Sequence, residues 1–275
     1  MKLLDRIFGR SRETATGSLE RRSGRAVRAR YDAAETNDVN KRHWLHAIGL
    51  SADAAANPHT RMILRNRARY EAANNSFARG IVATLANQTI ATGPRLQMNL
   101  EDPEVNREIE QEFGRWAKAV NLAEKLRMAR RAKTESGEVF MVLVSNPKLP
   151  TRVKLDIKLV EADQVTSPRT PLINERGVDG IRYDAHGNPT EYHILKRHPG
   201  DLHGFSKDPA NLHDIDRVPA NEVIHYFHAE RPGQSRGVPE LTPALPLFAQ
   251  LRRYTLAVIG SAEIAANWAG ILYTE

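Results

Sequence analysis

A short stretch, residues 223–245, divides this sequence into two parts of different character. It opens with Val223 to Phe227, which is apolar and aromatic and carries the β-branched residues that strands favour. Proline and glycine residues between positions 231 and 243 then indicate a tight turn followed by the first turn of a helix. We therefore predict a strand, a loop and a helix start here. Both helical and strand patterns occur before this stretch, and a helical pattern follows it.

Helical patterns dominate the first part of the chain. Ser51 is predicted to begin a helix, and after Asn57-Pro58 the apolar spacing predicts one long helix from about His59 to Ala91. Asp102-Pro103 opens another helix, because proline suits the first helical position. A further helix is expected over Leu122–Thr134, with Leu122, Leu126 and Ala129 facing inward.

Four arginines, Arg61, Arg65, Arg67 and Arg69, lie in the first half of the long predicted helix. Long basic side chains can lay their stems on apolar surface while the charged heads stay in water. We therefore expect a solvated face with buried stems, and prefer this interpretation to a phosphate-binding face.

The strand patterns are concentrated in the middle of the chain. The continuous apolar run Val139–Val144 predicts a strand buried on both faces, and the alternating segment Val153–Val160 predicts a half-buried strand paired with it. Alternation also predicts a short strand over Arg95–Leu100. Val178–Tyr183 and Glu191–Leu195 are expected to form a hairpin around a Gly/Asn turn.

Residues 199–219 are expected to form a long polar loop or a weak hairpin. Long N-terminal helices, a mixed or antiparallel sheet and a C-terminal helix together make the predicted fold class α+β.

The positive charge of the chain is concentrated at its start. Residues 1–30 carry nine basic and three acidic side chains, a net charge of +6, against +7 for all 275 residues. We expect a flexible basic arm there, which contacts nucleic acid or stays solvated, and a nearly neutral remainder. The expected nucleic-acid contacts within the arm are Arg21, Arg22, Arg25, Arg28 and Arg30. The chain has no cysteine, which excludes disulfides and thiolate chemistry.

Tyr254–Tyr273 is the one candidate for a membrane span, because it contains no lysine or arginine. Glu263 lies near its centre, and a carboxylate there costs about 2.5–3.5 kcal/mol on insertion scales. Several alanines weaken its hydropathy further. A packed or oligomer-facing helix is the better interpretation.

No motif for catalysis, a cofactor or a metal emerges. Phosphate-binding glycine loops, the dinucleotide-binding fingerprint and the serine nucleophile elbow are all missing. His225 and His228 are three residues apart, so in an extended strand they would point to opposite faces and could not share a metal. His43 and His46 could share one on a helix, but no third ligand lies beside them. We predict no catalytic, cofactor or metal residues.

An alternative function rests on three charged residues. Asp156 and Lys158 form an acid-x-Lys pair on a predicted strand, and Glu138 heads the strand before it. Magnesium-dependent nucleases of this type hold the metal between two carboxylates while the lysine polarises the attacking water. Charged residues also alternate on any solvated strand face, which is the interpretation we prefer.

Several segments together resemble the lambda-type family of tailed-phage portal proteins. The most specific is the Val223–Phe227 strand followed by Glu230–Pro239; Arg182–Pro189, Tyr192–Leu195, Arg197–Asp201 and Arg217–Ala220 add to it, as does the early helix with Asn74-Asn75. The resemblance covers residues 31 to the end.

The resemblance implies a structural protein and not an enzyme. Portal subunits of this kind form a ring, usually of twelve, at one capsid vertex of the virion, through which double-stranded DNA is packaged and ejected. The implied partners are the capsid protein, the terminase large subunit and head-completion proteins, after assembly in the cytoplasm of the bacterial host.

The resemblance also implies a domain organisation. Residues 1–30 would be the flexible basic arm, residues 31–235 an α+β wing and residues 236–275 the start of the helical stem. The junction between wing and stem would contain Arg231, Pro232, Gly233, Gln234, Arg236, Gly237 and Pro239. Family members are about twice this length, so we expect a fragment or a prophage remnant. The alternatives are the magnesium-dependent nuclease and a nucleic-acid-binding module acting through the basic arm.

Overall fold

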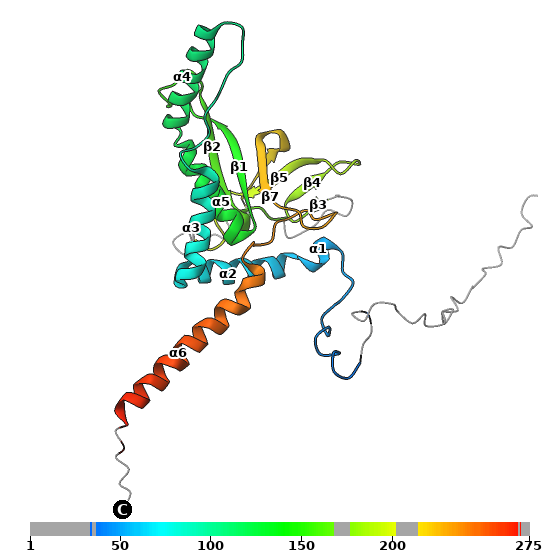
Figure 1. The fold of residues 1–275 in the computed structure, drawn as a ribbon. Coiled ribbons are helices and arrows are strands. Elements are labelled where there is room, and N and C mark those ends of the chain that lie inside the picture. The colour runs from blue at the N-terminus through cyan, green and yellow to red at the C-terminus, as the bar shows by residue number, and fades with distance from the viewer. Residues whose placement is uncertain (1–33, 35–36, 168–176, 202–213, 269, 271–275) are drawn as a thin grey trace, which may run out of the picture. The chain divides into compact units, whose positions relative to one another are not determined.

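The computed structural model describes residues 34, 37–167, 177–201, 214–268 and 270 (Figure 1). The five arm arginines, Arg21, Arg22, Arg25, Arg28 and Arg30, lie outside the described residues. The chain divides into two compact units, residues 1–49 and 50–275. In the described part of the first unit, residues 38–46 form turns, and Trp44, Leu45 and Ile48 are exposed.

The second unit contains both helices and strands, so the fold is α+β as predicted. Its α-helices are α1 (Ala52–Ala55), α2 (Pro58–Asn74), α3 (Ser76–Ile90), α4 (Pro103–Ala119), α5 (Leu122–Ser136) and α6 (Leu245–Asn267). Local chemistry explains several of the helix starts. The side chains of Ser51, Asn57 and Asp102 cap α1, α2 and α4, and proline occupies the first turn of α2 and α4.

The prediction of one long helix from His59 to Ala91 was wrong, because the chain turns sharply between α2 and α3 (Figure 1). Asn75 has extended backbone angles, and its side chain accepts hydrogen bonds from the N–H groups of Phe77 and Ala78. An asparagine that caps the second helix in this way ends the first one, because it cannot stay helical itself.

The prediction of a strand over Arg95–Leu100 was also wrong. The backbone N–H groups of Met98 and Leu100 donate to the side chains of Glu110 and Asn106 on α4, at 2.8 and 3.0 Å. Polar side chains of a helix therefore satisfy this backbone within the chain, and no strand of the described residues pairs with it.

Two antiparallel sheets form the centre of the unit. The first has the strand order β2-β1-β7, built from β1 (Glu138–Ser145), β2 (Leu155–Glu161) and β7 (Val223–Phe227). The second has the order β3-β4-β5-β6, built from β3 (Gly177–Val178), β4 (Ile181–Tyr183), β5 (Pro189–Leu195) and β6 (Ile215–Pro219). The predicted pairing of β1 with β2 is confirmed, and β1 is buried on both faces along its first five residues.

Two details of the second sheet differ from the prediction. Residues 178–183 are not one strand, because Asp179 and Gly180 both have positive φ and form a tight turn between β3 and β4. Asp-Gly is a favoured pair for such turns. Within the expected polar loop, residues 215–219 form β6, which pairs with β5.

The main core lies between the two sheets. Phe140, Val142 and Val160 of the first sheet pack there against Ile181, Tyr192 and Ile194 of the second. On the other face of the first sheet, α5 packs Ala129 against Val139 and Met141, as its predicted inward face requires. The layers are therefore helix, sheet and sheet.

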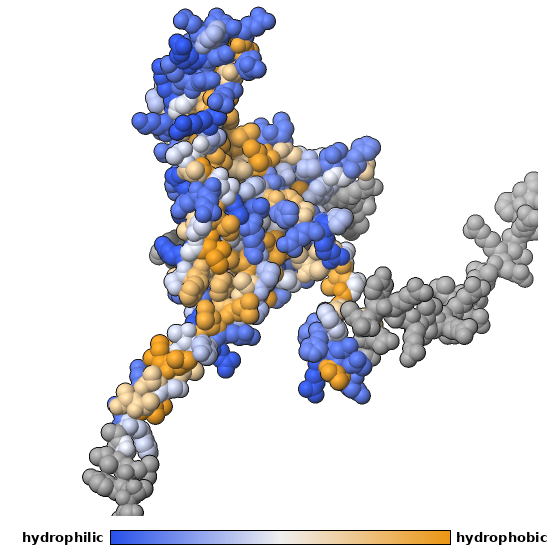
Figure 2. Space-filling model, in the orientation of Figure 1, coloured by the Kyte–Doolittle hydropathy of each residue, from blue (hydrophilic) through white to orange (hydrophobic). Residues whose placement is uncertain are grey.

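A further cluster joins α2, α3 and the base of α6. Ala68 and Ala72 of α2 and Val82 of α3 contact Leu245 and Phe248 of α6 there. From Tyr254 onward the apolar side chains of α6 are exposed, including Tyr254, Leu256, Val258, Ile259 and Ile264 (Figure 2). Among the described residues, the helices are too short or too polar to cross a bilayer.

Candidate functional site

The loop between β7 and the final helix is the candidate site; we call residues 228–244 the junction loop. It carries every residue predicted for the wing–stem junction. Pro232 and Gly233 are exposed at its turn, where Gly233 has a φ of 77°. Gln234 closes this turn by accepting from the N–H of Glu230 at 2.9 Å and donating to the carbonyl of Arg236 at 2.8 Å.

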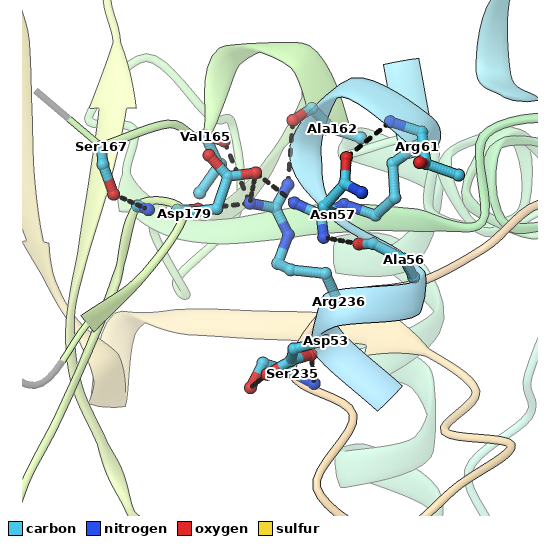
Figure 3. A network of polar contacts seen from close by, with 12 residues as sticks. Asp53, Ala56, Asn57, Arg61, Ala162, Val165, Ser167, Asp179, Ser235 and Arg236 are labelled. Carbon is cyan, nitrogen blue, oxygen red and sulfur yellow. Dashed lines mark hydrogen bonds and ion pairs between the residues drawn. The ribbon is translucent and has the colours of Figure 1, made fainter. Parts of the chain in front are cut away.

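Two contacts attach the turn of the junction loop to the region of α1. The guanidinium of Arg231 donates to the carbonyl of Leu50 at 3.0 Å. Ser235 donates from its backbone N–H and from its hydroxyl to the two carboxylate oxygens of Asp53, at 2.8 and 2.7 Å (Figure 3). This two-point contact fixes where the chain enters the interior.

Arg236 points from the junction loop into the centre of the unit and is 1% exposed. Its Nε donates to both carboxylate oxygens of Glu138, at 2.9 and 3.0 Å, and its Nη2 lies 2.7 Å from Oε1. Glu138, the first residue of β1, is fully buried. This arginine–carboxylate pair connects the junction loop to the central strand of the first sheet.

The rest of the Arg236 guanidinium binds the second sheet and the chain that leads to it. It donates to the carbonyls of Ala162 and Val165, both at 3.1 Å, and to the carbonyl and carboxylate of Asp179 (Figure 3). A planar group with five donors can satisfy such a divergent set of acceptors, whereas an ammonium group cannot. Arg236 therefore holds both sheets and the junction loop together.

Glu138 stays ionised despite its burial. Burial alone would raise the pKa of its carboxyl group, but the charge of Arg236 and hydrogen bonds from His225 and Arg236 hold that pKa well below its usual range. His225 on β7 lies 2.9 Å away through its Nε2. Burial lowers the pKa of His225, so the ring is neutral at pH 7 and donates its Nε2 proton to Glu138.

The arginines of α2 were predicted to form a solvated face, and this was wrong for two of them. Arg61 is 1% exposed and Arg65 6% exposed, and both point toward the sheets. Arg61 pairs with Asp179, and Arg65 binds Asp163 with its Nε and Nη2, at 3.2 and 3.0 Å. A buried arginine requires a carboxylate partner, and two partly buried ones supply it: Asp163 in the turn that follows β2 and Asp179 in the turn between β3 and β4.

The other two arginines of α2 differ from each other. Arg69, half-buried, bridges Glu161 and Asp163 at 3.0 and 2.7 Å. Arg67 is exposed, as expected for a solvated position. Arg61, Arg65 and Arg69 are spaced by four residues, so they form one row along the helix and attach it to both sheets.

Backbone contact closes the junction loop onto the end of α5. The N–H of Gly237 donates to Oε2 of Glu138 at 2.9 Å. A Cβ on Gly237 would lie 2.2 Å from the carbonyl oxygen of Gly137, and one on Gly137 would lie 2.4 Å from the carbonyl carbon of Val238. Both positions therefore require glycine. Pro239, two residues after Gly237, is also buried.

The last part of the junction loop lies along α5 and directs α6. Glu240 accepts hydrogen bonds from Arg130 at 2.8 Å and from Thr134 at 3.0 Å. Beyond it, Leu241 is buried in the cluster that contains the base of α6, and Arg252 of α6 pairs with the buried Glu71 of α2. The direction in which α6 leaves the unit is thus set by ionic and apolar contacts together.

The three residues of the nuclease alternative are not brought together. Asp156 lies opposite Val144, at the far end of β1 from Glu138, a separation of about 20 Å along the strand. Asp156 instead pairs with Lys125 and accepts from Asn146 at 3.0 Å. Glu138 already has its charge neutralised by Arg236.

One trio of described residues could hold a metal ion by distance alone. Donor atoms of Glu161, Asp163 and His198 lie within 4.8 Å of one another. However, Nη2 of Arg69 already contacts both carboxylates, so a cation occupies the position. His225 is bound to Glu138 while His228 is exposed, and His43 and His46 are exposed in the first unit.

Several residues of the site were missed at the level of sequence. Asp53, Asp179 and Glu240 were not singled out, although each holds part of the junction loop. Two signals could have found some of them: the Asp-Gly pair predicts the turn at Asp179, and the four-residue spacing of the α2 arginines predicts one shared face.

Taken together, the site is a buried ionic network that fixes the base of a helix whose outer turns expose apolar side chains. The family comparison agrees. The sequence matches the family described as phage portal protein, lambda family, over residues 40–275, and the chain belongs to that family. The family is structural rather than enzymatic, forms an oligomeric ring and is part of the phage virion at the portal vertex. No curated protein matches the sequence significantly.

Proposed function

We propose that this chain is a subunit of a phage portal ring through which double-stranded DNA is packaged and ejected. The observation that carries the proposal is the difference between the buried base of α6 and its exposed outer turns. Its base is fixed by Leu245, Phe248 and the Arg252–Glu71 pair, whereas its outer turns expose Leu256 at 66% and Ile264 at 65%. A helix fixed at one end and apolar at the other is suited to pack against copies of itself.

In this proposal the α+β part of the chain is the wing and the helical part begins the stem. The junction residues set the angle between them by their contacts with α1, β1 and α5. The ring would be a dodecamer in the complete protein, and its partners would be the capsid protein, the terminase large subunit and head-completion proteins. The subunit itself would have no catalytic role, because the described site is an ionic network with every carboxylate already paired.

The basic arm has a separate proposed role. Arg21, Arg22, Arg25, Arg28 and Arg30 would contact phosphates of DNA, supported by the net charge of +6 over residues 1–30. Such contacts weaken steeply with salt, because each one releases counterions. Deleting residues 1–30 should therefore abolish a salt-sensitive DNA affinity; affinity that survives the deletion would contradict this role.

Electron microscopy of the purified chain tests the proposed function. We expect closed rings with a central opening, which become smaller or disappear when Leu256 and Ile259 are both changed to Asp. The matched control changes the polar residues Thr255 and Ser261 to Asp on the same helix. Single, unassociated particles in the unmodified protein would contradict the proposal, as would cleavage of supercoiled DNA in magnesium that Asp156→Ala abolishes.

A further inference from the structure

The outer edge of β2 contains backbone groups that have no partner among the described residues. In the register of β1 with β2, the even-numbered residues of β2 bond to β1, since the carbonyl of Lys154 accepts from the N–H of Asn146. The odd-numbered residues therefore direct their N–H and C=O groups away from the sheet. No strand of the described residues pairs with this edge.

The first half of this edge is covered and the second half is open. Nε1 of Trp116 donates to the carbonyl of Leu155 at 2.7 Å, and the N–H of Ile157 donates to the carboxylate of Asp156 at 2.7 Å. Within the described structure the N–H groups of Leu159 and Glu161 and the carbonyl of Leu159 have no such partner. An exposed strand edge of this kind accepts a further strand.

A groove of about 740 Å³ runs beside the open half of the edge. Met128, Ala132 and Glu135 of α5 form one wall, and Leu159 and Glu161 of β2 form the other. Glu135 is half-buried and has no hydrogen bond or ion pair among the described residues. Burial raises the pKa of its carboxyl group, while the charges of Arg69, Arg131 and Arg79 act to lower it, so the carboxyl group lies among cations without pairing directly with one of them.

The chain itself contains a segment with the complementary edge. In residues 95–100 the N–H groups of Met98 and Leu100, two residues apart, both point to α4. An extended backbone directs the intervening residues, Gln97 and Asn99, to the opposite side. Both are exposed and their backbone groups are unpaired within the described residues, as is the side chain of Arg95.

We infer that residues 95–100 of one copy of this chain add to the open edge of β2 in a second copy. In an antiparallel register Gln97 would pair with Glu161 and Asn99 with Leu159, which matches the two-residue spacing on both sides. Residues opposite each other share a face, so Arg95 would lie on the α5 side, at the end of the groove where Arg69 contacts Glu161 and where Glu135 has no direct ion pair among the described residues. The inference rests on the proposed ring assembly and names one contact between neighbouring subunits of that ring.

Cysteine cross-linking tests the register, because the chain has no cysteine of its own. Directly paired residues have Cα atoms about 5.5 Å apart, within the range of about 4.4–6.8 Å that a disulfide spans. The double variant Gln97→Cys with Glu161→Cys should give a covalent ladder beyond the dimer under mild oxidation, and either single variant no more than dimers. The control pairs Gln97→Cys with the exposed Ser145→Cys and should give no ladder.

Exchanging the charges of Glu135 and Arg95 tests whether residues 95–100 of a second copy lie beside the groove. Glu135→Arg in the double-cysteine background should abolish the ladder, and adding Arg95→Glu should restore it. A ladder that is no stronger than in the Ser145 control, in a protein whose mass shows assembly, would overturn the inference and leave the ring proposal standing. A protein that stays monomeric at high concentration would overturn both.

Discussion

Glu138 is the residue on which most contacts of the site converge. It receives the guanidinium of Arg236, the imidazole of His225 and the N–H of Gly237, which come from two segments distant in sequence. From the sequence alone, Glu138 at the start of the apolar run Val139–Val144 could be interpreted as a catalytic acid. In the structure its charge is used to hold the junction loop inside the protein.

Glu138→Gln should lower the free energy of unfolding by about 3–5 kcal/mol, because it removes the buried carboxylate that pairs most closely with Arg236 and leaves only the longer contact with Asp179. Urea denaturation measures the loss. The control is Glu124→Gln, which breaks the solvent-exposed pair with Arg127 and should change stability by less than about 0.5 kcal/mol. Equal effects of the two changes would contradict the role assigned to Glu138.

The unfolding free energy should fall as the pH is lowered from 7 to 5. The pKa of His225 lies below its ordinary value of 6.5 in the folded protein, so below pH 6.5 the unfolded chain takes up a proton that the folded chain resists. The pKa of Glu138 is also depressed, so below its ordinary value of 4.5 the loss continues. Urea titrations at several pH values measure this loss. The unfolding free energy should depend less steeply on pH in His225→Gln than in the unmodified protein. The same pH dependence in both proteins would count against the role of His225.

Gly237→Ala should be strongly destabilising, by more than about 3 kcal/mol, because its Cβ would overlap the backbone of Gly137. Gly80→Ala provides the control. Gly80 lies within α3 with no atom near its would-be Cβ, so alanine there should stabilise the protein by about 0.5–1 kcal/mol. Thermal unfolding of the two variants should shift in opposite directions. A tolerated Gly237→Ala would show that the two backbones do not approach this closely.

At the scale of elements, those with strong periodicity were predicted well. β1, β7 and α5 lie where their apolar patterns place them, because each pattern reports directly on burial, whereas β2 begins two residues later than predicted and leaves Val153 exposed. The break between α2 and α3 was missed, because the apolar spacing continues through Asn75 while its side chain changes the backbone direction. The Arg95–Leu100 segment alternates like a strand, but α4 supplies hydrogen bonds that no pattern reveals.

Asn75→Ala should destabilise the protein by about 1 kcal/mol, since it removes the cap from the first N–H groups of α3. Asn75→Ser keeps an uncharged acceptor at the same position, without placing a second carboxylate beside the buried Glu71, and should retain most of the stability. Chemical denaturation compares the two variants. If alanine and serine behave alike, the capping bond does not determine the break between α2 and α3.

At the scale of the whole molecule, the candidate site was only half predictable. Arg236 was named as a junction residue from the resemblance to a family, but its partner Glu138 is 98 residues away in sequence. Side-chain pairing over such a separation depends on how the two sheets pack, which periodicity does not report. The burial of Arg61 and Arg65 was missed for the same reason, since their carboxylate partners lie about a hundred residues further along the chain.

The account as a whole depends on self-association through the exposed part of α6. The mass of the particle in solution, measured by sedimentation over a range of protein and salt concentrations, tests this most directly. We predict large oligomers with a defined subunit number, reduced when Leu256 and Ile259 are changed to Asp. A monomer that persists at high protein concentration would contradict the account.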